Sequence, residues 1–223
     1  MSDTARFELY AFWRTSATYR VRVAMNIKGL RAEEHNVDLI AGEQRRPEFL
    51  AVNPMGAIPA LVDREAASPT VLTQSSAILE YLDEISPAVP LLPGDAFGRA
   101  RVRSLAAMLV ADTHPLIVPR VVGYITEVGK FDAQAVAAWR THWLSTGLQA
   151  VEKRLASEPE TGTFCHGDAI TMADICLASI MVLLPIFNVE VRDIPTVERI
   201  FKACEANDAF ARAAPMRQAG APG

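Results

Sequence analysis

Strand-like and helical patterns of apolar residues alternate through the first half of the chain. One strand is predicted at residues 7–11 and another at residues 34–39, and the helix between them has its apolar positions at Val21, Ala24, Ile27 and Leu30. Because a helix-length connection separates the two strands, they are expected to run parallel. The chain therefore begins with a predicted βαβ unit.

Two further apolar runs, residues 60–62 and 70–73, are short and are separated by polar residues, which predicts a β-hairpin. Ser75 then precedes a helical pattern formed by Ile78, Leu82 and Ile85. Prolines and glycines are dense between residues 86 and 98, where both helix and strand should break. We predict domains at residues 1–86 and 99–223, joined by a linker at 87–98.

The second half carries helical patterns and no strand pattern. A clear apolar stripe runs along Leu144, Leu148, Val151 and Leu155. Thr171 and Asp174 have the spacing of a capping box, and the apolar run that follows predicts a central helix. We therefore interpret Thr171 and Asp174 as structural residues.

Composition narrows the possible function classes. The chain has 22 Lys+Arg against 26 Asp+Glu, a net charge of −4 and no block of like charges, so nucleic-acid and membrane-surface partners are not expected. The N-terminus has no leader pattern, and no uncharged apolar run reaches the length of a membrane span. Three cysteines without paired spacing and four scattered histidines favour reduced thiols and no metal site. We expect a soluble cytoplasmic protein.

Polar residues gather where predicted strands meet helices. Thr15 and Ser16 lie at the start of the first predicted helix, where they could cap the helix or donate hydrogen bonds to a bound anion. Ile58–Pro59 precedes a strand, as an ordinary turn or as a cis bond that exposes the Ile58 backbone to a peptide-like ligand. Gln74 and Ser75 occupy a third junction. Ligands of open α/β sheets bind at such an edge, so three junctions together predict a binding site.

These segments resemble the zeta class of cytosolic glutathione transferases, which includes maleylacetoacetate and maleylpyruvate isomerases. The resemblance spans residues 7–214 and is carried by Trp13-Arg14-Thr15-Ser16, Tyr19 to Ala24, Leu50 to Pro54, Ile58-Pro59, Gln74-Ser75, His114-Pro115, Gly167-Asp168 and Thr171 to Asp174. It implies an α/β thioredoxin-like N-terminal domain that binds glutathione, followed by an all-α substrate-binding domain. It also implies a homodimer.

The resemblance further implies a glutathione site. Gln44 would bind the glycine carboxylate, the Ile58 backbone before cis-Pro59 the cysteinyl part, and Gln74 with Ser75 the γ-glutamyl group. Thr15, with Ser16 as the second hydroxyl, would hydrogen-bond the sulfur and favour its thiolate. Asp112 and His114 match positions that face the active site in the family.

The reaction implied is a cis–trans isomerisation of a maleyl acid by the glutathione thiolate. Two substrate carboxylates call for cationic side chains, and Arg14 matches one of them. The second family arginine falls at Ile186 here. This departure keeps two alternatives open, which are conjugation or dehalogenation of a small electrophile, and a glutathione-binding protein without turnover.

Overall fold

The chain folds into two compact units. The structure is a computed structural model that describes residues 5–66 and 70–222. Met1–Pro90 and Asp208–Gly223 form unit 1, and Leu91–Asn207 forms unit 2. The division at Pro90 lies inside the segment 87–98 that the sequence predicts as a linker.

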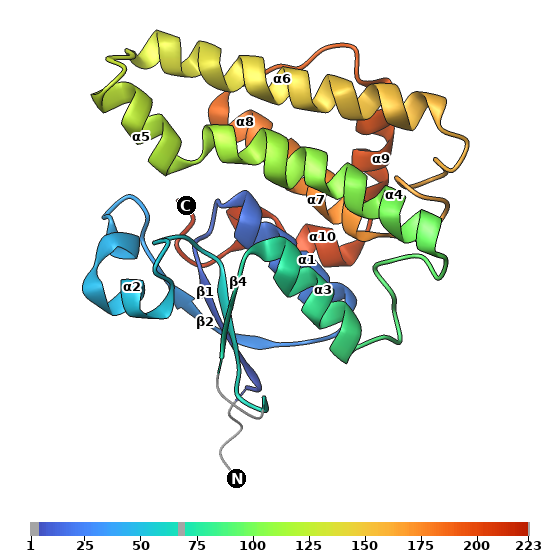
Figure 1. Cartoon of the computed structure of the whole chain (residues 1–223), viewed down its shortest axis with the longest axis horizontal. Coiled ribbons are helices and arrows are strands. Elements are labelled where there is room, and N and C mark those ends of the chain that lie inside the picture. The colour runs from blue at the N-terminus through green and yellow to red at the C-terminus, as the bar shows by residue number, and fades with distance from the viewer. Residues whose placement is uncertain (1–4, 67–69, 223) are drawn as a thin grey trace. The chain divides into compact units, whose positions relative to one another are not determined.

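Unit 1 is built on a four-stranded mixed sheet with the strand order β2-β1-β3-β4 (Figure 1). Its strands are β1 (Phe7–Ala11), β2 (Ala32–Asn36), β3 (Ala60–Asp63) and β4 (Val71–Thr73). β1 pairs in parallel with β2 and antiparallel with β3, and β3 pairs antiparallel with β4. The predicted βαβ unit and hairpin are confirmed, although residues 67–69 of the connection between β3 and β4 lie outside the described part of the chain.

Helices cover both faces of this sheet. α1 (Ser16–Ile27) and α3 (Ser75–Ile85) contact each other on one face, and α2 (Pro47–Val52), preceded by the 3-10 turn Glu43–Arg45, lies on the other (Figure 1). β1 alternates accordingly: Leu9 is buried, and Tyr10 on the opposite face has its ring 5.9 Å from that of Phe49 in α2. Because successive side chains of β1 point to opposite faces of the sheet, they contact different helices.

The C-terminal segment belongs to unit 1, whereas the sequence predicts a single second domain at residues 99–223. α10 (Asp208–Ala213) packs against α1, and the 3-10 turn Pro215–Arg217 follows it. Phe210 is buried, and Asn26 in α1 donates a hydrogen bond from Nδ2 to the Ala209 carbonyl at 2.9 Å. Burial of α10 on α1 explains why these residues join the first unit.

Asp63 at the end of β3 gives unit 1 a pH-dependent contribution to stability. Its carboxylate is 1% exposed, accepts from Arg6 Nη2 at 2.7 Å and from the Tyr81 hydroxyl at 2.6 Å, and these donors lower its pKa from 3.8 to about 2. A depressed carboxyl pKa stabilises the fold above the unfolded-state pKa, and this contribution is lost as the pH falls from about 3.8 towards 2.

Asp63→Asn should therefore lower the free energy of unfolding by about 1–2 kcal/mol near neutral pH and flatten its acid dependence below pH 4. Urea unfolding across the acid range measures both effects. Glu65→Gln is the matched control, because Glu65 contacts the same Arg6 at 3.3 Å but is 66% exposed. Equal acid dependence in Asp63→Asn and the unaltered protein would rule this contribution out.

Unit 2 is helical. Its helices are α4 (Ala96–Ala107), α5 (Pro119–Glu127), α6 (Ala133–Ser157), α7 (Met172–Met181), α8 (Leu183–Phe187) and α9 (Pro195–Glu205). Between α4 and α5 the chain forms a π-helical segment, Met108–Thr113, and a 3-10 turn, His114–Ile117. Every residue of α7 is buried, and α7 packs against both α4 and α9, which confirms the predicted central helix.

The capping box at the start of α7 is also confirmed. The Asp174 carboxylate accepts from the Thr171 backbone N–H at 2.8 Å and from the Cys165 backbone N–H at 2.7 Å. Both Thr171 and Asp174 are buried. These residues therefore fix the N-terminus of the central helix, as their spacing predicts.

The helical run Ala96–Glu127 passes a length and hydropathy test for a membrane span. The run is not one regular helix, because the π-helical segment and two prolines, Pro115 and Pro119, interrupt it. α4 also packs against α7 within unit 2. A helix of a globular domain passes the same test, so this stretch is weak support for a span.

Candidate functional site

Three junctions of unit 1 meet at one edge of the sheet. Because β1 and β4 both run antiparallel to β3, the last residues of β1 and β4 lie at the same edge as the first residue of β3. The loop after β1 leads to Thr15, β3 follows Ile58-Pro59, and β4 leads to Gln74. The topology therefore gathers the candidate residues that the sequence places at separate turns.

Thr15 is the N-cap residue of α1 and is half-buried. Its side chain makes no capping bond to the helix, and its hydroxyl lies 2.7 Å from the Thr18 hydroxyl and 3.4 Å from the Phe12 carbonyl. A hydroxyl has one proton to donate and two lone pairs. Thr15 donates to the hydroxyl of Thr18, which is fully buried, and an exchange of donor and acceptor between the two hydroxyls would leave the Thr15 proton for a ligand.

Ser16 and Ser75 are held together by Arg20. The guanidinium donates from Nε to Ser75 Oγ at 2.9 Å and from Nη1 to Ser16 Oγ at 3.3 Å, and all three side chains are buried. These bonds link the first residue of α1 to the first residue of α3. Arg20 belongs to the motif used for the resemblance, but the sequence does not show that it joins two serines 59 positions apart.

Gln44 and Ile58 offer unused hydrogen-bonding groups in neighbouring loops. Gln44 is 7% exposed, and its Oε1 atom is buried without a partner among the described residues. Gly56 lies against the Gln44 carbonyl, where a Cβ would clash, so the two loops are in contact. Ile58 packs with Phe12 and Phe49, and its peptide N–H and C=O have no partner within the described residues.

The Ile58–Pro59 peptide bond is cis, one of the two alternatives for this turn.

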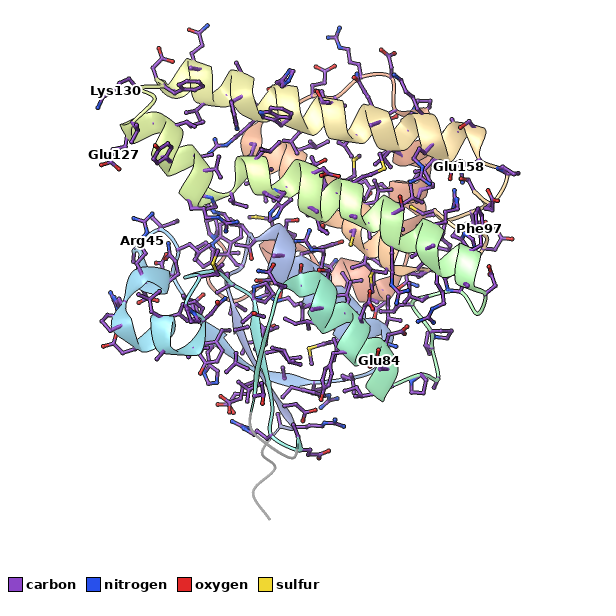
Figure 2. The ribbon with its side chains drawn as sticks, viewed as in Figure 1. Arg45, Glu84, Phe97, Glu127, Lys130 and Glu158 are labelled. Atoms are coloured by element: carbon purple, nitrogen blue, oxygen red, sulfur yellow. The ribbon has the colours of Figure 1, made fainter. Side chains whose placement is uncertain are left out.

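Figure 2 labels Arg45, which is exposed on the 3-10 turn that also carries the buried Gln44. The turn thus presents a cation beside a buried amide.

Gln74 has a backbone conformation that non-glycine residues rarely adopt. Its φ is 68° and its ψ is 112°, at the junction between β4 and α3. Such a conformation costs about 1–3 kcal/mol and persists where the surrounding structure holds it, often at a ligand site. The strained backbone at Gln74 therefore indicates that the Gln74–Ser75 peptide belongs to a ligand site.

Arg14 lies beside aromatic rings in the loop before α1. Its guanidinium carbon is 6.0 Å from the centroid of the Phe12 ring and 5.8 Å from that of the Trp13 ring. No carboxylate among residues 5–66 and 70–222 forms an ion pair with Arg14. Its charge is therefore available to an anionic ligand.

Asp112 and His114 belong to unit 2, in the π-helical and 3-10 segments that continue α4. Asp112 is exposed and His114 is half-buried. The π-helical turn is accompanied by a bond from Thr113 Oγ1 to the Met108 carbonyl at 2.7 Å. Such turns are frequent at functional sites, so these two residues stay candidates.

A cation stacks on the residue that follows Ile186, the position at which the resemblance implies an arginine. The Arg140 guanidinium carbon in α6 stands 4.6 Å from the centroid of the Phe187 ring, which follows Ile186 in α8. Trp143, one turn along α6 from Arg140, has a buried Nε1 with no partner among the described residues. Sequence reasoning missed Arg140, because 46 positions separate it from Ile186.

The cysteines offer no nucleophile. Cys165, Cys176 and Cys204 are buried and form no disulfide with one another, and burial raises the pKa of the Cys165 and Cys204 thiols. Nor do His, Cys, Asp and Glu side chains form a group able to hold a metal ion anywhere in the described ranges. Apart from Asp112 and His114, the candidate site therefore consists of hydroxyls, amides and guanidinium groups.

Comparison with known proteins gives consistent matches. Residues 5–84 match the family described as "Glutathione S-transferase, N-terminal domain". A maleylpyruvate isomerase from Ralstonia is 39% identical over 211 residues, which cover 95% of this chain and 98% of that protein.

Solved structures agree. A maleylacetoacetate isomerase from Methylobacterium extorquens AM1, with bound malonate and GSH, has 47% identity and a TM-score of 0.93, covering 97% of this chain and 100% of that one. A maleylpyruvate isomerase described as a bacterial glutathione S-transferase in the zeta class has 39% identity and a TM-score of 0.91. The match covers 96% of this chain and 100% of that one.

Proposed function

Because this chain belongs to the zeta class of glutathione transferases, we propose that it is a glutathione-dependent cis–trans isomerase of a maleyl-type dicarboxylic acid. The observation that carries the proposal is the set of unused hydrogen-bonding groups at one edge of the unit 1 sheet. Unit 1 supplies the residues assigned to glutathione together with Arg14, and unit 2 supplies the other residues assigned to the electrophilic substrate.

The residues at this edge fit glutathione. The unpartnered peptide of Ile58 suits a ligand that itself contains peptide bonds. The exposed Arg45 and the Gln44 Nε2 amide group can donate to the glycine carboxylate, and the buried, unpartnered Gln44 Oε1 can accept from a ligand N–H. Gln74 and Ser75 bind the γ-glutamyl end, where the Ser75 hydroxyl accepts from Arg20 and keeps its own proton to donate.

Thr15 lowers the pKa of the ligand's thiol by donating a hydrogen bond to the sulfur, and the N-terminus of α1 adds a favourable dipole. The buried Thr18 hydroxyl positions Thr15 through the 2.7 Å hydrogen bond between the two side chains. Ser16 is 1% exposed and accepts from Arg20, which favours Thr15 as the residue that contacts sulfur. When bound, glutathione supplies a thiolate whose reversible addition to a cis double bond permits rotation to the trans isomer.

Arginines hold the substrate carboxylates. Arg14 binds one carboxylate, and Arg140 supplies the positive charge that Ile186 lacks. Stacking on Phe187 keeps the Arg140 guanidinium in place, and the Trp143 indole N–H offers a further donor on the same face of α6. Asp112 and His114 are candidates for contacts with the ligands.

Arg20→Lys should weaken glutathione binding about tenfold or more, because a lysine keeps the charge but cannot donate to two serines through a planar fork. Isothermal titration calorimetry with glutathione measures the affinity, and urea unfolding measures the stability. Arg31→Lys, the same change at an exposed position of unit 1, is the control. Lower stability with unchanged affinity would leave Arg20 a purely structural residue.

Binding of glutathione should raise the melting temperature. Ligand at 100 times its dissociation constant adds about 2.7 kcal/mol, which corresponds to about 5–10 °C for a chain of this size. γ-Glutamylcysteine, which lacks the glycine carboxylate assigned to Gln44, should shift the melting temperature less. An unchanged melting temperature in saturating glutathione would refute the proposed function.

The protein is also proposed to act as a homodimer in the cytoplasm. The large apolar side chains Phe97, Tyr124 and Val128 are 70%, 66% and 57% exposed, and a second copy would cover such residues. Phe97 is labelled in Figure 2 at the start of α4. Light scattering should give a mass twice the chain's 24.3 kDa, and a mass of one chain would contradict the dimer.

A further inference from the structure

Unit 1 contains a cavity that none of the glutathione-site candidates lines. Its volume is about 260 Å³, and it lies among the end of α1, the start of β2, β1 and the C-terminal segment. The polar lining comes from Arg22, Asn26, Arg31, Glu34, Arg212 and Gln218. The apolar lining comes from Leu9, Met25, Leu30, Ala32 and Ala213.

Arg22 is the buried cation of this cavity. Its side chain is 7% exposed and pairs with Glu34, with Nη2 to Oε2 at 2.6 Å and Nε to Oε1 at 2.9 Å. Its remaining nitrogen, Nη1, is buried and has no acceptor among the described residues. A buried charged donor without an acceptor is costly, so a ligand oxygen that reached this nitrogen would be stabilised.

The other charges leave the cavity cationic. Arg31 is exposed and forms no ion pair with any carboxylate in the described ranges, and Arg212 pairs only with the exposed Asp208, at 2.8 Å. Three arginines and one glutamate line the cavity, and Asp208 outside the lining offsets Arg212, which leaves a net charge of +1. This excess differs in sign from the chain's overall charge of −4.

The geometry points to a second ligand site, for a small organic carboxylate, in this cavity. Arginine forks match carboxylate oxygens, and the five apolar side chains would contact the short hydrocarbon part of such an anion. Inorganic phosphate shares the charge but has no hydrocarbon part, so it should bind less tightly. The inference does not rest on the proposed function, because it uses none of the residues assigned to glutathione or to the maleyl substrate.

The test uses the full chain saturated with glutathione, methyl-labelled at methionine and titrated with succinate at constant ionic strength. Met25 lines the cavity, whereas Met55 is exposed in the loop before Ile58 and serves as the reference. We expect a saturable shift of the Met25 methyl resonance with succinate, a weaker effect with phosphate and none with neutral succinamide.

Arg31→Gln should weaken succinate binding at this site about threefold or more, the effect of an ion pair at an exposed position. Arg217→Gln, the same charge change at an exposed residue outside the lining, should leave binding unchanged. Isomerase turnover should be the same in both variants, so this test can fail while the proposed function stands.

Four results would overturn the inference. They are no saturable shift at Met25, a shift confined to Met55, equal losses in the two variants, or phosphate binding as tightly as succinate. The variants change exposed side chains only, so misfolding is not expected to obscure the outcome.

Discussion

Thr15→Ala should reduce isomerase turnover about a hundredfold or more, the usual effect of removing a preorganised donor to an anion. Glutathione affinity should change much less, because the other contacts are proposed to come from Gln44, Ile58, Gln74 and Ser75. The pKa of the bound thiol should rise, which the ultraviolet absorbance of the thiolate reports. The loss should therefore fall on kcat and not on the glutathione dissociation constant.

Two control variants sharpen this test. Thr15→Ser keeps the hydroxyl and should retain most of the turnover. Ser16→Ala removes a hydroxyl that is buried and accepts from Arg20, so its effect on the thiol pKa should be small. If Ser16→Ala raised the thiol pKa and Thr15→Ala did not, the sulfur contact would belong to Ser16.

Arg140→Gln should lower kcat/KM for a maleyl dianion about tenfold to a hundredfold, since a charge-assisted hydrogen bond contributes roughly 1.5–3 kcal/mol. Turnover of a neutral electrophile such as an aromatic halide should change little. Arg192→Gln, at an exposed residue of the same unit, is the matched control. Steady-state assays with both substrates measure the ratio of kcat/KM for the dianion to that for the neutral electrophile.

Ile186→Arg is the complementary change. It should raise activity on the dicarboxylate more than on the neutral substrate, and more strongly in the Arg140→Gln background, where the charge is missing. Equal losses on both substrates in Arg140→Gln would make Arg140 a structural residue that stacks on Phe187. Arg14 would then remain as the one arginine assigned to the substrate carboxylates.

The sequence predicts the elements of the fold that are determined by short local patterns. The strand β1 alternates buried and half-buried residues, and the capping box at Thr171 and Asp174 is a local hydrogen-bond pattern, so both follow from short stretches of sequence. β2 was predicted at residues 34–39 but forms at Ala32–Asn36. Four of its five residues are polar and three are exposed, and pairing with β1 outweighs their weak strand propensity.

The π-helical segment Met108–Thr113 was not predicted, because its cause lies in tertiary packing. Thr113 packs against Gly147 in α6, where a Cβ would collide with its side chain, and its hydroxyl bonds to the Met108 carbonyl. Neither contact leaves a periodic signal in the sequence. The same holds for Arg140, whose partner ring is on another helix.

The candidate site was predictable only in part. Turn residues marked the junctions at Thr15, Ile58 and Gln74, and the sheet topology brings these junctions to one edge. The sequence could not show that Arg20 engages two serines or that the Ser16 hydroxyl is enclosed. These facts depend on side-chain burial, and they bear on which of the two hydroxyls can reach a sulfur atom.

The central proposal is tested most directly by following a maleyl substrate, with maleylacetone as surrogate, by proton NMR with and without glutathione. We expect conversion of the cis to the trans isomer only when glutathione is present, without consumption of glutathione, and with kcat/KM on the order of 10⁴ M⁻¹s⁻¹ or above. Stoichiometric loss of glutathione with no trans product would instead identify a conjugating transferase. The absence of any reaction would contradict the proposal that this protein is an enzyme.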